Sequence, residues 1–199
     1  HGDNDHVGGA GSVLQGLPVR SGMGAWPDAL ADWPSTRRPP WQPCQAGTRW
    51  VWDGVRFEVL WPDVAHLPDK DNDRSCVLRI VTAGGSMLIP GDLEKPGEEA
   101  LLAGPHRAAL HADVLSLGHH GSKTSTSAAW LTAVSPRMVV ASLGYRNRYR
   151  HPHPTVVARV QQAGIPGWRT DRAGAVQVLL GENGAPIRTT RWRAERVHY

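Results

Sequence analysis

Four residues whose side chains can bind metal ions stand within the first six positions of the chain. The opening sequence, HGDNDHVGG, contains His1, Asp3, Asp5 and His6, followed by two glycines. If this stretch is extended, alternate side chains point the same way, so we predict that His1 and Asp3 bind one ion. Asp5 and His6, where the chain turns towards a helix, would bind a second. The alternative interpretation is a hydrophilic terminus that is simply exposed to solvent.

Further candidate ligands follow two apolar runs. In LIPGDLE, Asp92 comes directly after a predicted buried strand, and its carboxylate there could bridge two cations, although Gly-Asp is also a common turn. In LSLGHHGSKTSTS, His119 and His120 precede Ser122 and Lys123. One histidine is often a structural residue of the core, whereas two adjacent ones at a strand end favour a site. Of the pair we expect His119, nearer the strand, to be the ligand.

The segment GYRNRYRHPHPT combines arginines with possible site residues. It suits a phosphate-facing edge in which Asn147 and His151 reach the site. The arginines that would hold a polyanion there are Arg146, Arg148 and Arg150. The alternative is a solvated loop that leads into a helix with Pro154 at its start, and for His153 we prefer that alternative.

The rest of the sequence must position these residues, and it predicts a mixed, loop-rich fold. With 199 residues, 22 glycines and 16 prolines, the chain can bury a core yet needs many turns. It has no apolar run long enough to span a membrane. The net charge of +4 suits an anionic partner such as nucleic acid, or mere solubility.

The hydrophobic patterns predict both strands and helices. Residues 50–60, with a central Asp-Gly, and residues 75–92, with a Gly-Gly turn, are typical of β-hairpins. Helices are expected over 10–17, 94–103, 125–134 and 153–164, and further strands over 112–118, 137–144 and 175–181. Pro18–Pro43 is predicted to be an irregular insertion. This mixture indicates a layered α/β architecture.

Cys44 and Cys76 are the two cysteines of the chain. From their number alone, two buried thiols and one disulfide are equally acceptable.

Taken in order, the motifs HGDNDHVGG, LIPGDLE, LGHHGSKTS, GYRNRYRHPHP and WRTDRAGAVQV resemble the metallo-β-lactamase-like domain of ComEC-type DNA-uptake competence proteins. The resemblance covers nearly the whole chain. It implies that residues 1–199 form one α/β domain, a four-layered αββα sandwich. The family fold begins with additional strands ahead of the ligand motif, so we expect this domain to be N-terminally truncated.

The resemblance also implies a ligand set for two divalent metal ions. The HxDxDH motif corresponds to His1, Asp3, Asp5 and His6, the bridging carboxylate to Asp92, and the late histidine to His119 or His120. Most of the superfamily has histidine in place of Asp3, and the extra oxygen ligand favours Mn²⁺, with Zn²⁺ as the other candidate. The superfamily also uses a histidine before the bridging aspartate. Here DKDNDRSC offers Asp71, Asn72 and Asp73, of which we choose Asn72.

The implied activity is that of a metal-dependent phosphodiesterase, a nuclease that degrades the non-transforming DNA strand during DNA uptake. Asp5 would orient the attacking hydroxide, and Lys123 and His151 would neutralise phosphate charge, with His151 or a water protonating the leaving oxygen. The residues expected to contact DNA phosphates are Ser122, Lys123, Arg146, Asn147, Arg148 and Arg150. The alternatives are a hydrolase of small esters or lactones, and a noncatalytic DNA-binding module.

The partners implied by the resemblance are DNA, the membrane-channel portion of the same full-length protein and other competence proteins. The whole protein would be an inner-membrane protein with this domain on the periplasmic side. An oxidising location of that kind favours a disulfide between Cys44 and Cys76.

Overall fold

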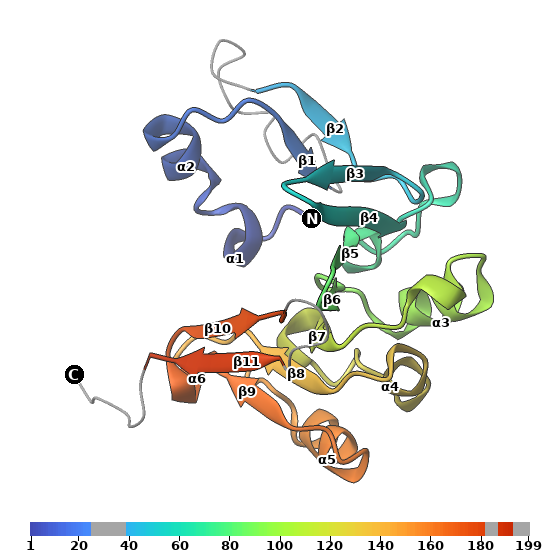
Figure 1. Ribbon diagram of the computed structural model, residues 1–199, viewed down its shortest axis with the longest axis vertical. Helices are drawn as coiled ribbons and strands as arrows, with labels where there is room; N and C mark the ends of the chain where they lie inside the picture. The colour runs from blue at the N-terminus through green and yellow to red at the C-terminus, as the bar shows by residue number, and fades with distance from the viewer. Residues whose placement is uncertain (25–38, 182–186, 193–199) are drawn as a thin grey trace.

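The computed structural model describes residues 1–24, 39–181 and 187–192, and its centre is a mixed sheet of seven strands (Figure 1). The strand order follows the chain from β3 to β9. The strands are β3 (Arg49–Trp52), β4 (Val55–Trp61), β5 (Val77–Thr82), β6 (Gly85–Ile89), β7 (Val114–Ser116), β8 (Met138–Ala141) and β9 (Gly167–Arg169). Strands β3 to β6 pair antiparallel, and β6 to β9 pair parallel.

Both predicted hairpins are present in the antiparallel half. Asp53 and Gly54 connect β3 to β4 with φ angles of 49° and 77°, the positive values that a two-residue turn between twisted strands requires. In the second hairpin Thr82 pairs with Gly85, so the turn residues are Ala83 and Gly84, one position earlier than the Gly-Gly pair.

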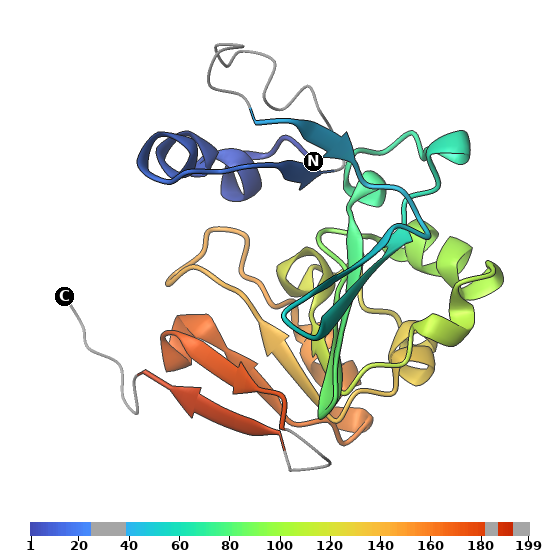
Figure 2. The ribbon, with the colours of Figure 1, turned by 45° about the horizontal axis from the view of Figure 1, so that its top comes forward.

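The parallel half alternates strands with helices, and the predicted helices and strands of this region are confirmed. The helices are α3 (Lys95–Ala103), α4 (Ala128–Val134) and α5 (Pro154–Gln162). Helices α3 and α4 lie on one side of the sheet (Figure 2). Leu101, Trp130 and Val156 of these helices are buried in one core with Leu88 and Leu115 of the sheet. The carboxyl ends of β6, β7 and β8 therefore meet at one edge, the usual place for a ligand site in such sheets.

The N-terminal segment contains two short helices, α1 (Asn4–Val7) and α2 (Ala10–Gly16), and two strands, β1 (Gly22–Gly24) and β2 (Trp41–Pro43). The two strands pair in parallel, so the prediction of an irregular insertion over Pro18–Pro43 is wrong at both of its ends. Residues 25–38 of that insertion lie outside the described residues. The ring of Trp41 covers the strand, because a Cβ on Gly22 would lie 2.2 Å and one on Gly24 2.5 Å from it.

The C-terminal part adds α6 (Thr170–Ala173) and an antiparallel hairpin of β10 (Val176–Leu179) and β11 (Arg188–Arg191). The hairpin lies on the side of the sheet opposite α3 and α4 (Figures 1 and 2). Of these elements only β10 was predicted. The described residues also contain short 3-10 helices: η3 (Val64–His66), η4 (Asn72–Arg74), η5 (Arg107–Ala109) and η6 (Gly118–Gly121).

A disulfide joins Cys44, next to β2, to Cys76, next to β5, with the two Cα atoms 5.7 Å apart. The described residues thus form the predicted mixed α/β fold. They contain one sheet of seven strands and two sheets of two strands, whereas a complete αββα sandwich has two large sheets. Within these residues, no helix has the length and apolar character that crossing a membrane requires.

Candidate metal centre

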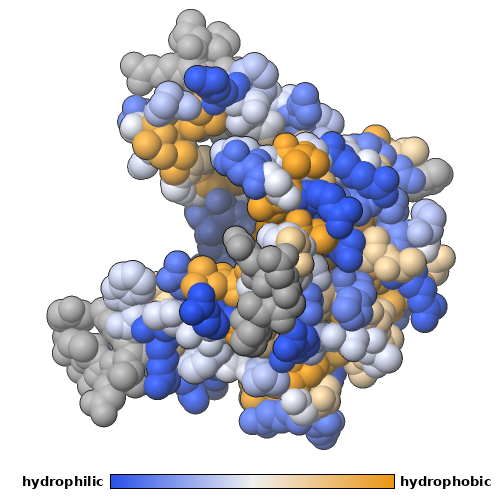
Figure 3. All heavy atoms as spheres, viewed as in Figure 1, coloured by the Kyte–Doolittle hydropathy of each residue, from blue (hydrophilic) through white to orange (hydrophobic). Residues whose placement is uncertain are grey.

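The candidate ligands meet at the edge of the sheet where the parallel strands end. Asp92 follows β6, the His119–His120 pair follows β7, and the N-terminal segment brings His1, ahead of α1, and His6, within α1, next to Asp92. Figure 3 shows that the molecule is hollowed between its N-terminal segment and its C-terminal hairpin, with hydrophilic side chains at the back of the hollow. Residues 91 places apart in the sequence, His1 and Asp92, are thereby brought into contact.

The HGDNDH motif is not extended as expected. The carbonyl of Asp3 accepts hydrogen bonds of 2.9 Å from the N–H groups of His6 and Val7, which closes the helical turn of α1. The turn brings the rings of His1 and His6 together, with their centroids 4.1 Å apart. The correction has a physical cause: one helical turn, rather than alternation along a strand, is what directs both imidazoles at the same carboxylate.

That carboxylate belongs to Asp92, which is only 3% exposed. Its Oδ2 lies 3.4 Å from Nε2 of His1, and its Oδ1 lies 3.2 Å from Nε2 of His6. Ser75 Oγ accepts the N–H of Asp92 at 3.0 Å and fixes the residue. Burial by itself would raise the pKa of Asp92, but the contacts with His1 and His6 lower it far below the usual range. Asp92 is therefore ionised, with its two oxygens facing two different histidines.

The ligand atoms form three overlapping groups, and within each group they lie within 4.8 Å of one another. The groups are His1, Asp3 and Asp71; Asp5, His6 and His120; and His1, His6 and Asp92. The first two groups keep the pairing that the sequence predicted, His1 with Asp3 and Asp5 with His6. The third group connects them through Asp92.

The two adjacent histidines have different surroundings, and His120 is the one that lies in a ligand group with Asp5 and His6. Nε2 of His120 lies 3.4 Å from Oδ2 of Asp5 and 3.3 Å from Nε2 of His6. Its Nδ1 hydrogen-bonds the carbonyl of Ser142 at 3.0 Å, so Nδ1 carries the proton and Nε2 is left with a lone pair facing the group. His119 contacts Glu94, with 3.3 Å between Nδ1 and Oε1. Nε2 of His119 lies 3.7 Å from Oδ2 of Asp92, and Nε2 of His120 lies 3.7 Å from Oδ1.

The backbone of both histidines is strained, with φ angles of 48° for His119 and 53° for His120. Such left-handed conformations cost about 1 kcal/mol or more for residues other than glycine, and they concentrate at functional sites. These conformations occur at the strand end where both imidazoles approach Asp92.

The loop expected to replace the missing histidine of the superfamily lies beside His1. Asp71 lies in the group beside His1 and Asp3, so it is a further candidate ligand next to Asn72, which stays a prediction. Asp73 is buried and its Oδ1 accepts the N–H groups of Glu94 and Gly97, so it is a structural residue. Among the contacts of the described residues, none joins Asn72 to the ligands. Asp71 was one of three residues that the sequence offered, and it lies within ligand distance of His1 and Asp3.

The donor set fits divalent cations. Both ring nitrogens of His1 are buried without a hydrogen-bond partner among the described residues, which is unusual for buried polar atoms. Contact with Asp92, opposed by burial and supported by Asp3 and Asp71, raises the pKa of His1. A site that holds a proton in this way also attracts a cation, and its imidazole and carboxylate donors suit Mn²⁺ or Zn²⁺.

Two residues expected to touch DNA are used inside the protein instead. Ser122 is buried, and its hydroxyl lies 3.0 Å from that of Thr124. Both side-chain atoms of Asn147 bond the backbone of His151, with Nδ2 donating to the carbonyl at 2.9 Å and Oδ1 accepting the N–H at 2.7 Å. These bonds shape their loops, so neither side chain is available to a phosphate. Lys123 is exposed on its loop.

His151 reaches the site, but not as a cation. Its ring centroid lies 5.9 Å from that of His119. Burial, followed by repulsion from His119 and His120, lowers the pKa of His151. A neutral imidazole cannot neutralise phosphate charge, so that part of its predicted role is disfavoured. The exposed arginines of its loop are Arg146, Arg148 and Arg150.

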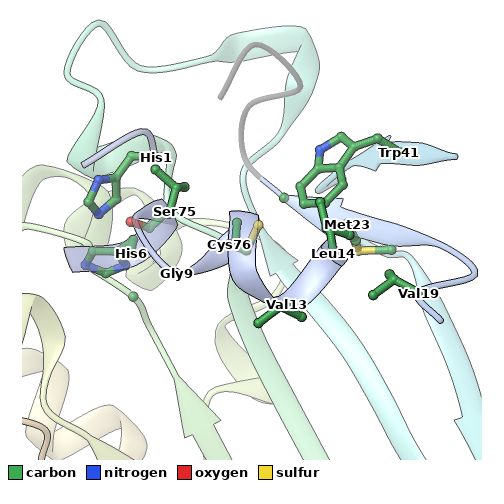
Figure 4. Close-up of a pocket in the computed structure, with 14 residues that line it drawn as sticks. His1, His6, Gly9, Val13, Leu14, Val19, Met23, Trp41, Ser75 and Cys76 are labelled. Carbon is green, nitrogen blue, oxygen red and sulfur yellow. The ribbon is translucent and has the colours of Figure 1, made fainter. Parts of the chain in front are cut away.

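Two cavities open beside the ligands. One, of about 600 Å³, has His1 and His6 at one end and Val13, Met23 and Trp41 at the other, so its walls are mainly apolar (Figure 4). The second, of about 290 Å³, is lined by ligands on one side and by the β8–α5 loop on the other. Its lining residues are Asp5, His120, Ser142, Leu143, Gly144, Asn147, Tyr149 and His151.

Sequence reasoning missed Glu94 and Tyr149. Glu94 stands two positions after Asp92, in the same PGDLE motif, and that proximity was the available signal. Its Oε1 accepts the hydroxyl of Thr124 at 2.8 Å, and Lys70 lies 3.4 Å from Oε2. Tyr149 lies between the arginines that attracted attention.

Comparison with known proteins places this site in a family. Residues 1–144 match the sequence family described as the metallo-beta-lactamase superfamily. The chain is 49% identical over 146 residues to competence protein ComA of Neisseria gonorrhoeae, covering 73% of this chain and 21% of the relative. It is 32% identical over 194 residues to recombination protein 2 of Haemophilus influenzae, covering 96% and 23%. It is 40% identical over 124 residues to ComE operon protein 3 of Bacillus subtilis, covering 62% and 16%.

The chain therefore spans about a fifth of the length of the first two relatives. The resemblance to ComEC-type competence proteins is confirmed by these matches. Because the family match extends over most of its length and includes every candidate ligand, the chain belongs to the metallo-beta-lactamase superfamily.

Proposed function

We propose that this protein is a metal-dependent phosphodiesterase, a nuclease that degrades the non-transforming DNA strand during DNA uptake. Hydrolysis is the general activity of the superfamily. The observation that carries the proposal is the position of Asp92, whose two oxygens face His1 at 3.4 Å and His6 at 3.2 Å. A carboxylate between two sets of ligands is the arrangement that a pair of cations needs in phosphoryl chemistry.

Two divalent ions, Mn²⁺ or Zn²⁺, would occupy this centre. One would be held by His1, Asp3 and Asp71, and the other by Asp5, His6 and His120, with Asp92 between the two groups. When bound, such ions lower the pKa of a water molecule for attack on phosphorus and neutralise charge on the phosphate oxygens. The two carboxylates of the first group favour Mn²⁺, since manganese prefers oxygen ligands more than zinc does.

The protein's own residues would then position the substrate and handle protons. Asp5 is exposed beside His120 and can hydrogen-bond a water molecule above the site. His151, kept neutral by burial and by its histidine neighbours, would accept a proton rather than supply positive charge. Positive charge for the phosphates would come from Lys123 and from the arginines of the β8–α5 loop.

The proposed partners follow from the relatives. Two of them are named competence proteins or products of a competence operon, so we propose DNA, the membrane-channel portion of a longer chain and other competence proteins. Competence proteins of DNA uptake are often membrane-associated. The disulfide of Cys44 and Cys76 supports a position on the periplasmic side, since disulfides persist in oxidising compartments.

Hydrolysis of labelled oligonucleotides tests the proposal. The protein loaded with Mn²⁺ or with Zn²⁺ is incubated with single-stranded and double-stranded DNA, beside Asp5→Ala and the control Asp69→Asn, an exposed carboxylate outside the three ligand groups. We expect metal-dependent cleavage that falls at least about 100-fold in Asp5→Ala and is unchanged in Asp69→Asn. Hydrolysis of a lactone or small ester without DNA cleavage, or DNA binding without any hydrolysis, would contradict the nuclease.

A further inference from the structure

We propose that Tyr149 is the surface on which an unpaired nucleobase of the substrate stacks while the neighbouring phosphodiester lies at the Asp92 centre. This inference rests on the proposed function and adds a specificity-determining residue to it. The residues discussed so far could hold phosphates, but phosphates are the same in single strands and duplexes. Stacking on Tyr149 would make the site prefer DNA whose bases are unpaired and unstacked.

The position of Tyr149 is the first argument. It lines the cavity of about 290 Å³ together with Asp5 and His120, two members of one ligand group. Its ring lies nearly parallel to that of His151, with an interplanar angle of 17° and 5.8 Å between the centroids. A group stacked on Tyr149 in this cavity would therefore lie against the metal ligands themselves.

The exposure of the ring is the second argument. Tyr149 is 62% exposed although it lines a cavity, so most of its surface is open to an incoming group. Arg148 lies over the ring, with its guanidinium carbon 4.9 Å from the ring centroid and Nη2 donating to the tyrosine hydroxyl at 2.6 Å, so a base would stack beside this exposed arginine or displace it. Tyrosine rings and arginine planes are the side chains on which unstacked bases settle in single-strand binding sites.

The loop that carries Tyr149 is also held in place. The two bonds from Asn147 to the backbone of His151 span the tyrosine, and the carbonyl of Gly144 accepts the N–H of Asn147 at 3.2 Å. Because the loop is already held by hydrogen bonds, Tyr149 loses little conformational freedom when a base binds. This small entropy cost favours affinity.

The size of the cavity favours single-stranded over double-stranded DNA. At about 290 Å³ it lies at the small end of ligand pockets, which is enough for roughly one nucleotide. In a duplex each base is covered on both faces by its neighbours, so it must leave the stack before it can lie on a side chain. A single strand, or the frayed end of a duplex, offers such a base without that cost.

The test compares a base-bearing strand with a backbone of equal charge. Fluorescence anisotropy measures binding of a labelled thymidine oligonucleotide and of an abasic oligonucleotide of the same length, with EDTA present so that neither is cleaved. The variants are Tyr149→Ala, Tyr149→Trp and the control Tyr145→Ala, a tyrosine of the same loop that does not line the cavity. Thermal unfolding of each variant checks that its fold is intact.

We expect Tyr149→Ala to weaken binding of the thymidine strand roughly 5- to 100-fold and to leave the abasic strand unchanged. Tyr149→Trp should restore the preference for the base-bearing strand, and Tyr145→Ala should retain it. Equal losses for both oligonucleotides, or the same loss in Tyr145→Ala, would overturn the inference. If the wild-type protein distinguishes the two strands through Tyr149 but cleaves no DNA with Mn²⁺ or Zn²⁺, the nuclease proposal fails and the stacking site stands.

Discussion

His1 and Asp92 form the contact on which the chemistry of the centre depends. The histidine lies 3.4 Å from the carboxylate, and both are removed from water. Each residue stabilises the charged form of the other. Contact with Asp92 raises the pKa of His1 above 6.5, and the histidines lower the pKa of Asp92. A cation that binds here must displace the proton from His1, so metal and proton compete for the same nitrogen.

This competition predicts how metal affinity depends on pH. Because the pKa of His1 is raised, its proton is still bound at pH 6.5 and leaves only as the pH rises through the higher, folded-state value. Mn²⁺ affinity should therefore increase from about pH 6 to about pH 8, by at most about tenfold per pH unit for one displaced proton. In the metal-free protein the sign is opposite: the stability that protonated His1 contributes is present below 6.5 and is lost over the same rise.

Isothermal titration calorimetry at several pH values measures this affinity. Asp92→Asn removes the charge that holds the proton, so its affinity should be at least about tenfold lower and its pH dependence should shift to lower pH. Asp69→Asn should match the wild-type protein. An affinity that stays constant across the range, or falls as the pH rises, would contradict a proton-competitive site at His1.

The sequence predicted the residue types of the centre better than their arrangement. His1, Asp5, His6 and Asp92 were identified because ligand residues in one short motif and at a strand end are rare without a reason. Asp71 was not singled out, since it is one of several polar residues of one loop and only the fold shows that it faces His1. The partner of His120 is a backbone carbonyl, which leaves no signature in a sequence.

At the scale of elements, local signals predicted the hairpins and the alternating helices. The Asp53–Gly54 turn and the acidic, proline-containing start of α3 depend on neighbours in the sequence, so they can be read there. Helix α1 cannot, because a single turn is too short to be stable by itself. It forms where His6 meets Asp92, across more than eighty residues of chain.

Helix α3 also supports the loop that carries the strained histidines. Glu98 is 1% exposed, and its carboxylate accepts the N–H of Thr126 at 2.5 Å and that of Ser127 at 2.9 Å. From α5, Arg159 bonds the carbonyls of Ser125 and Thr126. The segment between η6 and α4 is thus held from two helices, and removing either contact would loosen it.

We predict that Glu98→Ala lowers the free energy of unfolding by about 3 kcal/mol, because two buried N–H groups lose a charged acceptor. Glu98→Gln keeps one acceptor oxygen and should lose about half as much. The matched control is Glu99→Ala on the next position, an exposed residue 3.6 Å from Lys95, whose loss should cost at most about 0.5 kcal/mol. Urea denaturation measures all three, and equal effects of Glu98→Ala and Glu99→Ala would contradict this role.

Over the whole molecule, the metal centre lies between the central sheet and the N-terminal segment. The apolar pattern of the sequence predicts the strands of the sheet clearly, whereas the elements of the N-terminal segment have only a weak pattern. Strands β6, β7 and β8 are fixed by apolar side chains buried in the core. In the N-terminal segment, neither α1 nor α2 contains a fully buried residue. This difference explains why the sheet was predicted and the ends of the insertion were not.

The disulfide is the covalent anchor between these two parts. Cys44 follows β2 and Cys76 precedes β5, and Cys76 is adjacent to Ser75, whose hydroxyl bonds the backbone of Asp92. The two cysteines are 32 positions apart. A disulfide that closes a loop of this length reduces the entropy of the unfolded chain, which stabilises the folded state by about 3 to 4 kcal/mol. One covalent bond therefore holds the N-terminal segment beside the position of Asp92.

Reduction should consequently cost stability in the metal-free protein. We predict that dithiothreitol lowers the free energy of unfolding by about 2 to 4 kcal/mol, measured by guanidinium denaturation with and without the reductant. The double variant Cys44→Ser/Cys76→Ser should be as unstable as the reduced protein and insensitive to dithiothreitol. An identical midpoint for the oxidised and reduced wild-type protein would mean that noncovalent contacts alone fix the segment. In that case His1 and His6 would be held at Asp92 by their own charges and not by this link.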